Sequence, residues 1–94
     1  MNLQRTVYSL LTRIEASILL IQSQTKHIKC ADDFMLTPEG TFTLSGVCMQ
    51  LIYIGESIKS IDAKTESKYL INYPKIPWTD IMGLRNIIRM NIIA

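Results

Sequence analysis

The sequence predicts an all-α protein, a small antiparallel helical bundle, and three observations carry this prediction. Two long stretches have apolar residues that recur in steps of three and four, which is the spacing of one helix face. No stretch alternates apolar and polar residues as a half-buried strand does. The chain has 94 residues, which is enough for one hydrophobic core and too few for two. We therefore expect a single domain over residues 1–94.

The first long helix is predicted at about residues 3–28. Its apolar stripe consists of Val7, Leu11, Ile14, Ile18, Ile21 and Ile28. Thr25 occupies the remaining slot in this spacing, and no glycine or proline interrupts the stretch. Charged and amide side chains occupy the opposite face. A helix of this kind buries its apolar face against a neighbour and exposes the other.

A short turn is predicted between the two long helices. Asp32 and Asp33 are residue types that cap a helical turn. The apolar residues Phe34, Met35 and Leu36 follow them directly. We expect this turn to pack those three side chains against the bundle.

The second long helix is predicted at about residues 38–62. Thr37 is a good N-cap, and Pro38 suits the first helical position. The apolar stripe consists of Leu44, Val47, Leu51, Ile54, Ile58 and Ile61. Gly46 and Gly55 are small residues at which another helix can approach closely.

A rigid loop is predicted to deliver a last helix at about residues 78–92. Residues 62–72 are expected to form a loop and a short helix across one end of the bundle. Pro74 and Pro77 restrict the backbone of the loop, and the large ring of Trp78 follows as an anchor. The apolar stripe of the last helix consists of Ile81, Leu84, Ile88 and Ile92.

Composition limits the classes of partner. The chain is 48% hydrophobic and 19% charged, which is more apolar surface than a domain of this size easily buries, so we expect a homodimer. The net charge is only +2 and the cationic residues are spread along the chain. A broad nucleic-acid footprint is therefore not indicated, no DNA partner is expected, and any RNA contact must be local.

No metal or other cofactor is expected. The only cysteines, Cys30 and Cys48, lack the spacing of a zinc site, and the chain has one histidine. The longest apolar run near the N-terminus, at 18–21, is too short for a signal peptide or a membrane span. We expect a cytoplasmic protein with reduced thiols and no membrane partner.

Arg85 and Asn86 are the first candidate site residues. Arg85 follows Leu84 of the apolar stripe and precedes Arg89 by one helical turn, so both guanidinium groups can project onto one surface. A planar, bidentate cation beside an amide can hold a phosphate or a carboxylate. The same spacing also fits a plain solvated face, and spacing alone does not separate the two interpretations.

Glu56 is a secondary candidate. It follows Gly55, where a neighbouring helix can come close, so its carboxylate could orient Arg85. The alternative is a surface pair with Lys59 three residues later, worth only tenths of a kcal/mol. His27, near the predicted end of the first helix, fits a group that offsets the helix dipole better than it fits a catalyst.

Three sequence elements, taken in order, carry a resemblance to a known family. They are Ile54-Gly55-Glu56, Tyr73-Pro74-Lys75-Ile76-Pro77-Trp78 and Gly83-Leu84-Arg85-Asn86. With them, the chain resembles the HepT-like proteins of the HEPN superfamily from about Val7 onward. The resemblance implies a dimeric helical bundle of bacterial or archaeal origin that cleaves RNA without a metal. It further implies the toxin of a toxin-antitoxin pair whose antitoxin is a minimal nucleotidyltransferase.

The chain departs from the motif of that family in its second half. Arg85 and Asn86 match the opening of the motif, which continues in the family to a histidine and, two residues later, a tyrosine. Met90 and Ile92 occupy those two positions here. Methionine cannot move protons, so the implied endoribonuclease activity is expected to be weak or lost, and whether the chain is an enzyme stays open. One alternative is a non-catalytic dimeric binding module for a nucleotidyltransferase antitoxin or for an intact homologue, and another is a purely structural dimeric bundle without a partner.

The ending of the chain, residues 87–94, is strongly apolar. We interpret the chain as a truncated family member that lacks the final helix of the family. The apolar strip would then be covered by a neighbouring chain or by another segment. The alternative is that the strip simply packs into the chain's own bundle, and the sequence favours neither.

Overall fold

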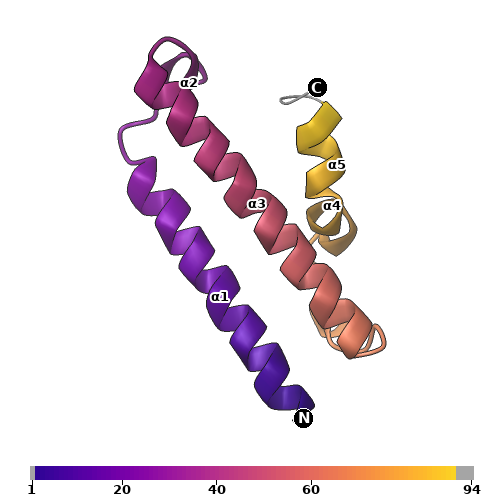
Figure 1. The fold of residues 1–94 in the computed structure, drawn as a ribbon. Coiled ribbons are helices and arrows are strands. Elements are labelled where there is room, and N and C mark those ends of the chain that lie inside the picture. Colours follow the sequence, from indigo (N-terminus) through magenta and orange to yellow (C-terminus); the bar gives the residue numbers. More distant parts are fainter. Residues whose placement is uncertain (1, 91–94) are drawn as a thin grey trace.

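The fold is a helical hairpin with a shorter helical segment packed along it. The computed structural model describes residues 2–90, and this part of the chain contains helices and no strand, which confirms the predicted all-α class. Helices α1 (Leu3–Gln24) and α3 (Pro38–Lys64) form the hairpin, and α4 (Trp78–Met82) and α5 (Leu84–Ile88) lie on the other side of α3 from α1 (Figure 1). The molecule measures 45 × 25 × 24 Å.

Helix α1 follows the predicted register but ends four residues before the predicted end. The Asn2 side chain caps its start by accepting a hydrogen bond from the Arg5 N–H at 3.3 Å. Val7 and Ile14 are buried as predicted. At the other end the backbone leaves the helical conformation at Thr25, whose hydroxyl donates to the Ile21 carbonyl at 2.7 Å. Such a side-chain bond competes with continuation of the helix.

The turn between the long helices contains α2 (Asp32–Met35). The Asp33 carboxylate accepts a hydrogen bond from the Lys29 N–H at 2.7 Å. The prediction that three apolar side chains pack inward here was wrong for two of them. Phe34 is half-buried, whereas Met35 and Leu36 are 69% and 77% exposed. A single helical turn spreads consecutive side chains around its axis, so it cannot bury all three.

Helix α3 begins as predicted and runs two residues beyond the predicted end. The Gly40 N–H donates to the Thr37 hydroxyl at 2.9 Å, with Pro38 at the first helical position. Gly40 is buried against the backbone carbonyls of α2, so a side chain there would collide with them. At the far end Glu66 and Ser67 adopt positive φ angles of 54° and 62°, and the chain reverses.

The core lies between α1 and α3 and extends under the segment that follows α3. The buried cluster consists of Val7, Ile14, Ile54, Ile58, Ile61 and Leu70. Ile61 is fully buried at 0% exposure. Leu70 comes from η1 (Leu70–Asn72), a short 3₁₀-helix that closes one end of the hairpin. Trp78, Ile81 and Met82 pack against the same cluster, so α4 is docked on the hairpin by apolar contacts.

Several large apolar side chains remain exposed on the hairpin. Ile18, a member of the predicted stripe, is 43% exposed, while Ser17 beside it is buried. Leu20, Phe42 and Met49 are 46%, 82% and 61% exposed. Among residues 2–90, no helix combines the length and hydropathy that a membrane crossing requires.

Candidate functional site

Two hydrogen bonds from Trp78, one from its indole and one from its backbone, hold the loop before α4 in place. The Trp78 Nε1–H donates to the Tyr73 carbonyl at 2.9 Å, and the Trp78 backbone N–H donates to the Ile76 carbonyl at 2.8 Å. The Tyr69 and Tyr73 rings lie 5.6 Å apart between centroids. A side-chain hydrogen bond with Tyr73 raises the pKa of the Tyr69 phenol. The predicted rigid approach loop anchored by Trp78 is therefore present.

The predicted C-terminal helix is divided in two at Gly83. Gly83 has φ −91° and ψ 5°, outside helical geometry, and its N–H donates to the Thr79 and Asp80 carbonyls at 3.1 and 3.2 Å. Helix α5 starts at Leu84, and the Gly83 carbonyl accepts from the Asn86 N–H at 3.0 Å. Glycine costs helix stability in an interior position, which makes this the natural place for the break. The remainder of the predicted helix, 91–92, lies outside the described residues.

Gly55 allows the α4–α5 junction to approach α3 closely. An added Cβ at this position would lie 2.6 Å from the Ile81 carbonyl oxygen and 3.7 Å from the Leu84 Cβ. The prediction of a close helix approach at Gly55 is thus confirmed. At Gly46 it was wrong, since nothing lies within 4 Å of an added Cβ there.

A methyl group at position 55 is expected to force α4 away from α3. We expect Gly55→Ala to lower the free energy of unfolding by about 1–3 kcal/mol, the usual cost of overpacking. Gly46→Ala is the matched control in the same helix. Because the space there is open and glycine is unfavourable inside a helix, the control should raise stability by about 0.5–1 kcal/mol. Urea denaturation measures both, and equal shifts of the same sign would contradict the close contact.

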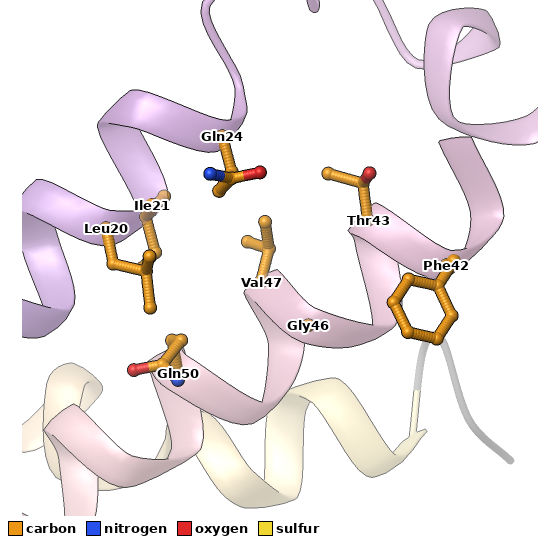
Figure 2. A pocket seen from close by; sticks show the side chains of 8 residues that line it. All are labelled: Leu20, Ile21, Gln24, Phe42, Thr43, Gly46, Val47 and Gln50. Atoms are coloured by element: carbon orange, nitrogen blue, oxygen red, sulfur yellow. The ribbon is translucent and has the colours of Figure 1, made fainter. Parts of the chain in front are cut away.

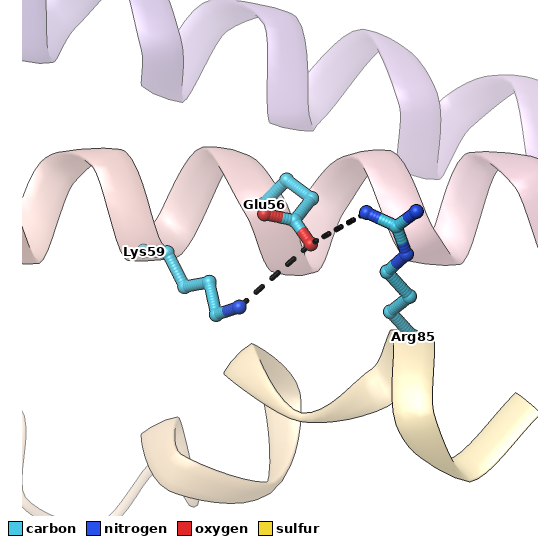
Figure 3. Close-up of polar contacts among 3 residues, drawn as sticks. All are labelled: Glu56, Lys59 and Arg85. Atoms are coloured by element: carbon cyan, nitrogen blue, oxygen red, sulfur yellow. Dashed lines mark ion pairs between the residues drawn. The ribbon is translucent and has the colours of Figure 1, made fainter.

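The carboxylate of Glu56 meets two cations, as Figure 3 shows. Its Oε1 atom lies 3.8 Å from the Lys59 Nζ on the same helix and 3.9 Å from the Arg85 Nη1 on α5. The side chains of Glu56, Lys59 and Arg85 are 41%, 52% and 66% exposed. The two pairings of Glu56 that the sequence offered as alternatives therefore coexist. Pairs this exposed contribute about 0–1 kcal/mol each to stability.

Comparison with known protein families identifies the family of this chain. The family model of the ribonuclease HepT-like proteins matches residues 14–91, which is most of the chain. This chain belongs to the HepT-like family. Comparison with curated proteins and with solved structures gives no match.

The other candidate residues and the two positions aligned by the resemblance lie along α5 and after it. Asn86 is exposed, and its backbone N–H is engaged with Gly83. Arg89 is also exposed, as is Met90 at 75%. Ile92 lies outside the described residues. Ile88, three residues after Arg85, is buried at 4% exposure and holds the neighbouring part of the same α5 face against the protein, while the longer Arg85 side chain stays 66% exposed.

His27 and Arg85 come from different parts of the fold. His27 is exposed in the turn after α1, and α1 and α5 pack on different sides of α3 (Figure 1). Within one chain, the structure therefore gives no contact between this histidine and Arg85 among the described residues.

An apolar groove lies between α1 and α3, separate from Arg85. It has a volume of about 180 Å³, and Figure 2 shows its lining side chains coming from both helices. They are Leu20, Ile21, Gln24, Phe42, Thr43, Gly46, Val47 and Gln50. The groove was not predicted from the sequence. The signal that could have revealed it is that Leu20 and Phe42, two of its lining residues, are apolar but lie outside the predicted stripes.

Proposed function

We propose that this HepT-like protein binds the phosphate backbone of RNA through Arg85, as a toxin-type ribonuclease whose cleavage activity is weak or lost. The single observation that supports it most is the setting of Arg85. Its guanidinium is exposed and is carried by a helix held against α3 by a glycine contact and by buried Ile88. Arginine held in this way suits charge-assisted bonds to phosphate.

The proposed loss of activity follows from the chemistry at position 90. RNA cleavage without a metal needs a group that exchanges protons near neutral pH while a cation stabilises charge on the phosphate. Arg85 provides a cation, whereas the Met90 thioether cannot act as an acid or a base. Asn86, adjacent to Arg85, is a second candidate for contact with the phosphate. Glu56, in this proposal, holds the Arg85 guanidinium over α3 in the free protein.

The test is RNA binding and cleavage by the purified chain in the presence of a chelator. Arg85→Ala is expected to weaken binding to a labelled RNA oligonucleotide by about tenfold, the worth of a hydrogen bond to a charged group. Arg13→Ala is the matched control, because Arg13 is exposed on α1, across α3 from α5. Fluorescence anisotropy measures the affinity. If both variants bind like the unmodified chain, the RNA-binding proposal fails.

A second candidate function is a non-catalytic dimeric module that pairs with a minimal nucleotidyltransferase antitoxin or with an intact homologue. The exposed apolar side chains along the hairpin favour it, because surfaces of this kind are typical of protein interfaces. Either function would operate in the cytoplasm. Sedimentation of the purified chain, alone and after coexpression with a minimal nucleotidyltransferase, tests this candidate. A monomer that forms no complex would contradict it.

A further inference from the structure

One oxygen atom of Glu56 lies between cations from two different helices. The Lys59 Nζ and the Arg85 Nη1 approach the same Oε1, at 3.8 and 3.9 Å (Figure 3). Both distances exceed those of a hydrogen bond, for which N⁺–H···O⁻ contacts measure about 2.7–2.9 Å. In the described part of the chain, residues 2–90, the Arg85 guanidinium makes this ion pair and no hydrogen bond. Its donors therefore remain available to another anion.

We infer that Lys59 and Arg85 form one phosphate-binding subsite and that the Glu56 carboxylate occupies it in the free protein. This inference rests on the proposed RNA-binding function and adds to it a second cation and a competing anion. A phosphodiester oxygen of single-stranded RNA takes the place of the carboxylate oxygen between the two cations. The Glu56 side chain swings away, and both cations then bond the phosphate at hydrogen-bonding distance.

The exposure of the three side chains makes this exchange easy. All of them are at least 41% exposed, so a departing carboxylate regains contact with water. An ion pair in such a position is weak, and a carboxylate that sits between two cations repels an arriving phosphate. Lys59 is one turn from Glu56 on α3, whereas Arg85 comes from α5. The subsite therefore exists only while α5 is docked on α3.

The experiment compares RNA affinity across variants of the full chain. Labelled oligouridylate is titrated at a series of salt concentrations, and thermal unfolding checks that each variant is folded. Glu56→Gln is expected to raise affinity about two- to fivefold by removing the competing charge. Lys59→Gln is expected to lower affinity by about threefold or more, and to reduce the slope of log K against log salt by about 0.7, the value for one phosphate contact on a single strand.

The pair of Glu66 and Lys68 is the matched control. Its atoms lie 3.6 Å apart, both side chains are about four-fifths exposed, and neither pairs with Arg85. Glu66→Gln and Lys68→Gln change the net charge equally and should leave the salt slope unchanged.

The outcomes separate this inference from the function on which it rests. Weaker binding by Arg85→Ala, with Lys59→Gln and Glu56→Gln matching their controls, would overturn the shared subsite and leave the RNA-binding proposal standing. Weaker binding by Glu56→Gln would also overturn it, because the carboxylate would then assist the phosphate. Unchanged binding by Arg85→Ala would remove the proposed function itself.

Discussion

Met90→His is expected to raise cleavage of RNA by about 10²–10⁴-fold over the unmodified chain, which is the usual contribution of a general acid or base. The substituted imidazole would stand five residues after Arg85, where the family resemblance implies a histidine and where the proposed function places the lost acid or base. Met90 is 75% exposed, so the change should alter stability by no more than about 0.5 kcal/mol. Initial cleavage rates, measured with a chelator present, test this expectation.

Two controls make the Met90→His result specific. Met90→Gln introduces a polar side chain of similar length that does not titrate near pH 7, and it should leave the rate unchanged. The double variant Met90→His, Arg85→Ala should lose the gain, because the phosphate would no longer be held. The gained activity should depend on pH around the ordinary imidazole pKa of about 6.5. If Met90→His matches Met90→Gln, the missing histidine does not explain a lack of cleavage.

Ile61→Ala is expected to lower the free energy of unfolding by about 2–5 kcal/mol, since it combines lost apolar burial with a cavity. Ile61 is fully buried in the cluster that joins α1, α3 and η1. Small domains are stable by only about 5–15 kcal/mol in total. This one truncation therefore removes a large part of the folding free energy.

The matched control for Ile61→Ala is Ile71→Ala. Ile71 is 72% exposed, and its truncation should change stability by about 0.5 kcal/mol or less. Chemical denaturation followed by circular dichroism measures both variants. Similar losses at the two positions would contradict the position of the core described above.

The helical stripes could be predicted from the sequence because helix periodicity determines which residues share a face. Val7, Ile14 and Ile54 are buried for this reason. Periodicity does not determine whether a neighbour covers the whole face. Ile18 belongs to the stripe, yet it is 43% exposed.

Glycine shows a second limit of sequence reasoning. Gly46 and Gly55 sit in the same helix and are equally permissive, but only Gly55 meets another element. The choice between them depends on where the chain returns after its loop, which is a long-range packing outcome. The break at Gly83 depends on the same docking, because α4 and α5 each pack against α3.

The candidate site was partly predictable. Arg85 was found from helix spacing and from the family resemblance, and Glu56 from its position beside Gly55. Their approach to 3.9 Å required the actual docking of α5 on α3. The simultaneous contact of Lys59 was not predicted, because local spacing presented it as an alternative to Arg85.

The bond from the Trp78 indole to the Tyr73 carbonyl has a thermodynamic consequence for ligand binding. It spans a loop whose two prolines already restrict the backbone. Ordering a free residue costs about 1–2 kcal/mol of conformational entropy. Because these contacts order the loop when the chain folds, the proposed binding of RNA at α5 would require little further ordering of this segment. The loop is thus preorganised, and a small site with few contacts can keep more of its interaction energy as affinity.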